Sequence, residues 1–592
     1  MATRPDRPGD SGPTRTEPTT ISAPVAVVAP HERSSSAQDV DPRRPDCNLT
    51  TSEDEGDTTT LREQVEPIRS SGDVEKGLAS RAGSESEGNS ERDPSWRGRA
   101  GGSRGDEKDA KDDQVMIVDW KGPDDPAKPT NWPNPRRMTS TLIVAAFTVL
   151  APLSSSAISP AAGQVGAKLG ITADFELSMV TSVFVLAFAI GPLVFGPASE
   201  LVGRVRVLQA ANLLYIIFNL VCAFATTKGQ FIAFRFLSGL GGGAPLAIGA
   251  GVLSDLWKPE ERGKAAALYS LGPLLGPAVG PIFGGWVVER LDQNGYKWIF
   301  YSTTIFSALV QGLGLVLLRE TYHPVLLEQQ ARQLRKRLGL APDSEQVQTV
   351  FEAKAGGRKS PREVFARGMG RPFVLFASEP IIQVQAFYMS LLYGIIYIML
   401  VSTTNIFEQL YGQSVGIAST NFVSMGLGFF IASQAGARLL DVLYRRLKRH
   451  YGTEGKPEYR LPFQFPAAIL MPSGLLLYGW SAEHRLPWIC VDVGMAVVSL
   501  AIILVFQSTQ LYLIDVFPVH AASAVSTLVC LRSLFGFALP LAGPSLFQHL
   551  GYGPGCSLLA GIAILISWPM IPILWFYGER IRRRSRYAKK SS

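Results

Sequence analysis

The chain divides into a long polar segment and a series of apolar runs. Residues 1–115 are rich in Ser, Arg, Asp, Glu, Gly and Pro and contain few aromatic residues. Such a segment cannot bury enough apolar surface to offset the entropy lost on ordering, which predicts a disordered N-terminal tail. From Met138 onward, twelve apolar runs each approach the ~20 residues that span a bilayer as a helix. These runs are Met138–Ser159, Leu177–Pro197, Val207–Thr227, Phe231–Ser254, Ala265–Val288, Trp298–Leu318, Pro380–Ser402, Ile417–Leu440, Phe465–Ser481, Trp488–Tyr512, Ala521–Leu546 and Tyr552–Tyr577.

A second polar stretch, residues 319–378, separates six runs from six. We therefore predict an all-α membrane protein with twelve transmembrane helices in two six-helix halves, 116–318 and 379–578, followed by a basic tail at 579–592. Two halves that rock about a central site are typical of secondary transporters. Within the linker, Leu326–Arg337 has helical composition and a basic face, which suits either an anionic membrane surface or a solvated helix.

Lysine and arginine placement predicts the orientation, because cytoplasmic loops are enriched in these residues. Both termini, the linker and the basic loops fall on the cytosolic side if the first run crosses outward. The cations that set this orientation are Arg136, Arg137, Arg204, Arg206, Lys258, Arg262, Lys264, Arg445, Arg446, Lys448, Arg449, Arg580, Arg582, Arg583, Arg584 and Arg586.

The net charge of +7 follows from these loops and does not indicate a nucleic-acid partner. The five cysteines are scattered and form neither a disulfide framework nor a metal-binding spacing. The sequence also lacks a phosphate-binding loop and a catalytic triad, so we expect no enzyme activity and no cofactor.

The fifth run contains glycines at four-residue spacing, each of the first three followed by proline. The residues are Gly272, Pro273, Gly276, Pro277, Gly280, Pro281, Gly284 and Gly285. Glycines four apart share one helix face and admit a second backbone, and membrane neighbours can rescue a helix with several prolines. The eighth run has a similar small-residue face at Thr420, Ser424, Gly428, Ala432 and Gly436. Because two small-residue faces favour close helix contact, we predict that the fifth helix packs against the eighth across the two halves; the alternative is that each face packs within its own half.

These features resemble the major facilitator superfamily, and within it the twelve-helix fungal drug:proton antiporters. The glycine–proline run is similar to that group's antiporter motif, and Gly196–Arg206 is similar to the superfamily's loop motif between helices 2 and 3. Segments 118–132, 319–336, 457–462 and 478–481 match further signatures of the group in the correct order. Tyr296-Lys-Trp298 departs from the usual Trp-Arg-Trp. The resemblance implies proton-driven export.

In the loop motif, the candidate gating residues are Gly196, Ser199, Glu200, Gly203 and Arg204. Gly203 permits a tight reversal, and Glu200 and Arg204 could pair across the halves as a conformational latch. The alternative is that Arg204 serves only as a positive-inside anchor.

Arg235 and Arg532 lie within apolar runs, where a cation costs ~2.5–3.5 kcal/mol on insertion scales. Arg235 is about one turn inside the fourth run, and the resemblance implies a role in proton coupling or gating, whereas its position also allows snorkelling to the outer interface. Arg532 is near the middle of its run, so it must face a cavity or a cluster of carbonyls. Glu289 resembles a family glutamate at the outer end of helix 5.

The remaining candidates for substrate contact are Asn219, Tyr388, Tyr393, Tyr397 and Gln507. Aromatic and amide side chains with few buried acids favour a neutral or weakly basic amphiphile, such as a drug, toxin or secondary metabolite, over a polyamine. We therefore expect a monomeric exporter in the plasma or vacuolar membrane, whose partners are lipid, protons and this substrate. A nutrient or polyamine facilitator or symporter on the same fold is the alternative. The proton-carrying residue is not identified by the sequence.

Overall fold

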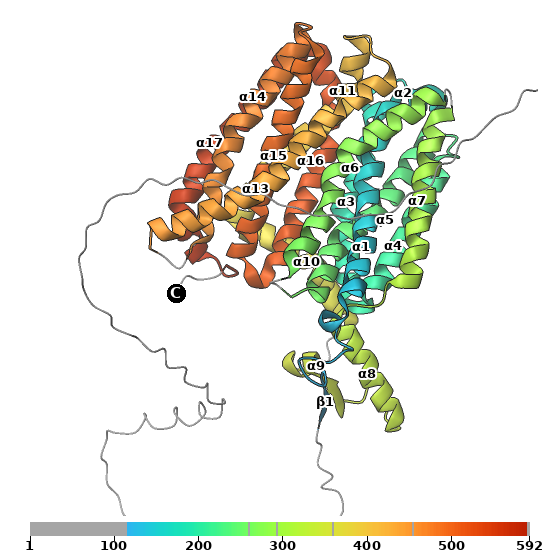
Figure 1. Cartoon of the computed structure of the whole chain (residues 1–592), viewed down its shortest axis with the longest axis vertical. Coiled ribbons are helices and arrows are strands. Elements are labelled where there is room, and N and C mark those ends of the chain that lie inside the picture. The colour runs from blue at the N-terminus through green and yellow to red at the C-terminus, as the bar shows by residue number, and fades with distance from the viewer. Residues whose placement is uncertain (1–114, 259–260, 292–293, 358–359, 453–454, 589–592) are drawn as a thin grey trace, which may run out of the picture. The chain divides into compact units, whose positions relative to one another are not determined.

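The computed structural model describes residues 115–258, 261–291, 294–357, 360–452 and 455–588, and the predicted tail lies outside them. These residues form two short strands and a series of helices (Figure 1). The strands are β1 (Met116–Val118) and β2 (Val347–Thr349). The α-helices are α1 (Asn134–Ala157), α2 (Ala162–Leu169), α3 (Asp174–Val202), α4 (Arg204–Cys222), α5 (Lys228–Leu256), α6 (Arg262–Arg290), α7 (Gly295–Leu317), α8 (His323–Arg337), α9 (Val350–Lys354), α10 (Pro361–Ser378), α11 (Pro380–Gln409), α12 (Val415–Thr420), α13 (Phe422–His450), α14 (Gln464–Glu483), α15 (Trp488–Val516), α16 (Ala521–Leu550) and α17 (Tyr552–Arg584).

Each of the twelve predicted spans coincides with one long helix: α1, α3, α4, α5, α6, α7, α11, α13, α14, α15, α16 and α17. Among the described residues, eleven helical segments are long and apolar enough to cross a membrane. The remaining span is α6, which is a continuous 29-residue helix despite Pro273, Pro277 and Pro281. The protein is therefore an all-α membrane protein, as the sequence predicts.

Contacts among the loops agree with the predicted orientation. Arg137 at the start of α1 pairs with Glu261 before α6, at 2.8 Å. Arg204, between α3 and α4, pairs with Asp255 at the end of α5, at 3.4 Å. Loops that the charge pattern assigns to one side of the membrane thus contact one another, and we refer to this side as the basic end.

Packing between the two halves involves specific helices. The helix α3 packs along α16, and α6 packs against α12 and α13. The largest buried cluster lies mainly in the second half and continues into the first through Ala151, Phe184, Phe188 and Tyr215. The halves therefore share part of one apolar core.

The linker and the segment before α1 form a small unit at the basic end (Figure 1). Strand β1 pairs in parallel with β2, in a register that places Met116 opposite Val347. The predicted linker helix is present as α8, but Arg335 on its basic face is buried, pairs with Glu328 and donates to the carbonyl of Val347. This part of the basic face holds the strand and is not free to meet a membrane surface.

Candidate transport site

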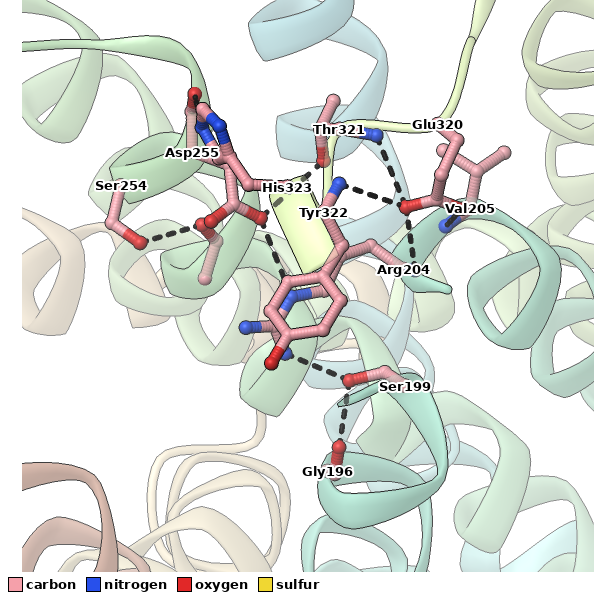
Figure 2. A network of polar contacts seen from close by, with 11 residues as sticks. Gly196, Ser199, Arg204, Val205, Ser254, Asp255, Glu320, Thr321, Tyr322 and His323 are labelled. Carbon is pink, nitrogen blue, oxygen red and sulfur yellow. Dashed lines mark hydrogen bonds and ion pairs between the residues drawn. The ribbon is translucent and has the colours of Figure 1, made fainter. Parts of the chain in front are cut away.

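At the basic end, one carboxylate accepts hydrogen bonds from several backbone amides in and near the loop motif (Figure 2). Glu320, just after α7, accepts from the amides of Arg204, Val205, Thr321 and Tyr322, at 2.8, 3.2, 3.0 and 3.0 Å. Two of these donors are the first amides of α4, which lack partners within the helix and carry its positive dipole end. Glu320 therefore caps α4 and joins it to the segment after α7.

The reversal between α3 and α4 depends on Gly203. Its φ of 114° is in the region that side chains rarely adopt, and a Cβ there would collide with the Glu320 carboxylate. The predicted tight reversal at Gly203 is confirmed, and its additional role is to admit the capping carboxylate.

The expected Glu200–Arg204 pair is not present in this structure. The Arg204 guanidinium contacts Asp255 Oδ2 at 3.4 Å and Ser199 Oγ at 2.8 Å, and it lies 4.6 Å from the centre of the Tyr322 ring. Ser199 in turn donates to the carbonyl of Gly196 at 2.7 Å. Glu200 is exposed and makes no ion pair in the described part of the chain. The described partners of Arg204 lie in the first half and at the start of the linker, and none of them belongs to the second half.

Burial shifts the pKa values of two further residues of this network, Tyr322 and His323. Burial, with a smaller effect of Glu200, raises the pKa of Tyr322 to about 12, so the phenol stays neutral. Burial lowers the pKa of His323, against the raising effect of its contact with the Asp255 carbonyl at 3.3 Å. Both rings therefore favour their neutral forms beside the Arg204–Asp255 pair.

The glycine face of α6 packs on α1, not on α13. A Cβ added at Gly272 or Gly276 would meet the backbone of Val149 or Leu153, at 3.1 and 3.0 Å respectively. At Gly280 and Gly284 it would collide with the carbonyls of Leu153 and Ala157. The predicted packing of the fifth helix against the eighth is confirmed, because α6 contacts α12 and α13. The four-spaced glycines of α6 do not make that contact, however, since they pack within the first half.

The small face of α13 is used in the same way within the second half. Gly428 approaches the Ala496 carbonyl and Gly436 approaches Gln507, both on α15. The halves still meet at α6, but through a different residue: Gly285 lies against Ser419 of α12. The four-spaced glycines themselves pack as the alternative describes, each set within its own half.

Arg235 does not snorkel to the interface. Its side chain is fully buried and donates to the carbonyls of Val180, Ser154 and Ser155, at 3.3, 3.2 and 3.4 Å. The guanidinium also lies 4.5 Å from the centre of the Phe184 ring. Carbonyls of α1 and α3 thus satisfy this cation, as burial requires.

A line of polar contacts leads from Arg235 into the second half. The hydroxyls of Ser155 on α1 and Tyr397 on α11 are 3.4 Å apart. The rings of Tyr397 and Tyr393 lie 5.0 Å apart, which confirms their shared helix face. Next to them, the Arg532 guanidinium lies 4.9 Å from the centre of the Tyr393 ring. We call these five residues the central row.

The other predicted substrate residues occupy packing positions. Asn219 is fully buried and donates to Thr303, Thr304 and the Phe300 carbonyl, which holds α4 against α7. Tyr388 is fully buried in the second-half core. Gln507 donates to the Ser433 carbonyl at 3.3 Å and joins α15 to α13. These positions favour structural roles for the three residues.

Glu289 joins the halves at the end opposite the basic loops. Its carboxylate accepts from the backbone amide of Gly416 at 2.5 Å. Close to Glu289 in the same helix, Trp286 donates to the hydroxyl of Thr420 in α12, at 3.1 Å. At the end of α1, Ser159 donates to the Leu400 carbonyl at 2.8 Å. Together these bonds hold the first half to the second at this end.

A family model described as Major Facilitator Superfamily matches residues 144–540. The chain belongs to the major facilitator superfamily. It is thus a multi-pass membrane transporter and not an enzyme.

The curated relatives of this chain described below are fungal transporters. The efflux pump vrtL of Penicillium aethiopicum is 40% identical over 480 residues, 81% of this chain and 93% of the relative. The efflux pump radE of Floropilus chiversii is 38% identical, covering 80% of this chain and 86% of the relative. The MFS-type transporter penM of Penicillium rubens is 36% identical, covering 81% and 92%. The similarity extends over nearly the whole length of each relative.

Solved structures agree on the fold. The xylose transporter XylE from E. coli, in a partially occluded inward-open conformation, matches with a TM-score of 0.56 at 15% identity, over 78% of this chain and all of that chain. A bacterial homolog of the human lysosomal transporter Spinster matches with a TM-score of 0.54 at 13% identity, over 77% of this chain and all of that chain. At these identities the likeness concerns the fold alone.

Sequence reasoning missed the two carboxylates that hold the loop motif of this transporter. Asp255 closes the fourth predicted span, and Glu320 stands in the segment after α7 that already resembled a group signature. The signal was available, because segments that resemble family signatures and lie on one side of the membrane can meet there. What the sequence lacked was the pairing, which depends on how α5 and α7 pack around α4.

Proposed function

We propose that this protein exports amphiphilic small molecules from the cytosol across the plasma membrane in exchange for protons. The central row supports this proposal: it runs from one half to the other inside the membrane and consists of aromatic rings, hydroxyls and two arginines. Side chains of these kinds suit a solute with a large apolar body. The similarity to fungal proteins named efflux pumps supports export over uptake.

Export against a gradient needs an energy source. A proton that crosses the membrane supplies ~2.3 kcal/mol per 100 mV, in addition to any pH difference. Because arginine stays protonated in proteins, Arg235 and Arg532 can bias a nearby proton site by repulsion but cannot carry the proton themselves. Glu289 is a carboxylate that bridges the two halves, and its bond to the Gly416 amide would break if this end opened.

The proposal is tested in inverted membrane vesicles that carry the protein and whose lumen is more acidic than the outside solution. The probe is N-phenyl-1-naphthylamine, a neutral aromatic amphiphile. We expect gradient-dependent accumulation that a protonophore abolishes and that vesicles without the protein lack. Uptake that is indifferent to the gradient contradicts proton antiport and favours a passive facilitator.

A further inference from the structure

Arg235 and Arg532 differ in how their guanidinium groups are satisfied. Arg235 has three carbonyl acceptors and is fully buried. Arg532 makes no hydrogen bond and no ion pair with any described residue, and its Nε is buried without a partner. The remainder of this side chain is half-buried. The sequence predicts that Arg532 faces either a cavity or a cluster of carbonyls. In the structure, Arg235 is the residue that faces a cluster of carbonyls, and Arg532 does not.

The surroundings of Arg532 are aromatic. Its guanidinium lies 4.9 Å from the centre of the Tyr393 ring on α11 and 5.3 Å from that of Phe506 on α15. Contacts with two different helices place the cation on the inner side of α16. Such rings attract the cation through their faces, but they leave the five N–H donors of arginine unused.

The depth of Arg532 makes an unused guanidinium costly. It is the twelfth residue of α16, about 16 Å along the helix, near the middle of a hydrocarbon core of about 30 Å. An arginine at this depth is kept by a partner, and none of the described residues supplies one.

We propose that Arg532 binds an anionic group of the exported amphiphile, a carboxylate, sulfonate or phenolate, while Tyr393 and Phe506 pack against its apolar body. This inference rests on the proposed function and narrows its substrate class. The planar guanidinium offers two parallel N–H donors to such a group, and the flanking rings keep the pair away from water. It also replaces the expectation from sequence of a neutral or weakly basic amphiphile.

The position of Arg532 connects this binding to the contact between the halves. An anion on the guanidinium would lie beside Tyr393, which packs on Tyr397, and the Tyr397 hydroxyl faces Ser155 of the first half. A bound anionic solute is therefore placed where it can bias the two halves toward each other.

The test uses a matched pair of fluorescent probes that differ by one charged group. 8-Anilinonaphthalene-1-sulfonate carries a sulfonate, and N-phenyl-1-naphthylamine is the same skeleton without it. Equilibrium binding of both is measured to the full chain in lipid nanodiscs, with no proton gradient. The variants are Arg532→Gln, Arg532→Lys and, as a control that removes a cation from an exposed loop, Arg485→Gln.

We expect wild-type protein to bind the sulfonate at least tenfold more tightly than the neutral probe. Arg532→Gln should lose at least tenfold in affinity for the sulfonate and change less than twofold for the neutral probe, which also reports that the variant is folded. Arg532→Lys should keep most of the sulfonate affinity, and Arg485→Gln should match wild type. Equal sulfonate binding by Arg532→Gln and wild type would overturn the inference.

Transport in vesicles separates this inference from the proposed function. Arg532-dependent sulfonate binding without gradient-driven accumulation of either probe would contradict proton-coupled export and leave the anion site standing. Gradient-driven accumulation of the neutral probe, with sulfonate binding unaffected by Arg532→Gln, would contradict the anion site and leave export standing.

Discussion

The hydroxyl of Ser155 lies 3.4 Å from that of Tyr397, and the two residues belong to opposite halves of the transporter. The Ser155 carbonyl also accepts from Arg235, whereas the Tyr397 ring packs at a tilt against Tyr393, beside Arg532. A single contact thus joins the satisfied arginine of the first half to the unsatisfied arginine of the second.

Removing the Tyr397 hydroxyl should weaken this contact. A hydrogen bond contributes about 0.5–1.5 kcal/mol, and the distance of 3.4 Å suggests the lower part of that range. We expect Tyr397→Phe to change the rate of vesicle transport two- to fivefold. Tyr388→Phe is the matched control, because Tyr388 lies on the same helix but is buried within the second half beside Ser567. Similar effects of both variants would argue against a special role for the Ser155 contact.

The close contact of α6 with α1 predicts intolerance to small side chains on the glycine face. Gly284→Ala would drive a methyl group into the Ala157 carbonyl, and overpacking of this kind costs ~1–3 kcal/mol. We expect a lower unfolding temperature for the purified protein. Gly312→Ala on α7 is the control, since nothing lies within 4 Å of its added Cβ. Equal stability of the two variants would refute the close packing.

The two glutamates near the loop motif should behave differently. Glu320→Gln replaces a carboxylate that accepts four backbone N–H groups, and hydrogen bonds to a charged acceptor contribute about 1.5–3 kcal/mol. We expect faster proteolysis of the linker and a several-fold loss of transport. Glu200→Gln removes an exposed charge and should leave both unchanged. The reverse order of effects would restore the latch that the sequence suggested.

Acidification should weaken the network at the basic end. The folded state lowers the pKa of His323 below its ordinary value of about 6.5, mainly through burial, so folding favours the neutral ring. Its stabilising contribution is complete above that value and is lost as the pH falls through the lower pKa of the folded state. We expect the unfolding temperature of wild type to fall between about pH 7 and pH 5 more than that of His323→Gln, measured by thermal scans at each pH. Parallel pH profiles would exclude this linkage.

Asp492 is a candidate for the proton-carrying group that the sequence did not identify. It is 6% exposed in α15, accepts from Ser424 at 3.5 Å and has no ion-pair partner in the described part of the chain. We expect Asp492→Asn to abolish the dependence of probe uptake on the proton gradient, because the amide cannot titrate. Ser424→Ala keeps the carboxyl group and should keep coupling. Full coupling in Asp492→Asn would assign the proton to another residue.

The sequence by itself determined the membrane helices and their grouping. All twelve apolar runs became long helices, since backbone groups in lipid are satisfied within a helix and the length of a span follows from bilayer thickness. The same local physics explains Gly203, whose backbone conformation requires glycine wherever the surrounding helices lie.

Only the tertiary structure decided which partners meet. The small-residue faces of α6 and α13 can each accept the backbone of a neighbouring helix. Their composition does not indicate that α6 takes α1 as this neighbour and that α13 takes α15. Likewise, Arg235 and Arg532 present the same guanidinium in apolar helices. Packing brings three carbonyls to Arg235 and two aromatic rings to Arg532, and this difference separates a structural cation from one still available to a ligand.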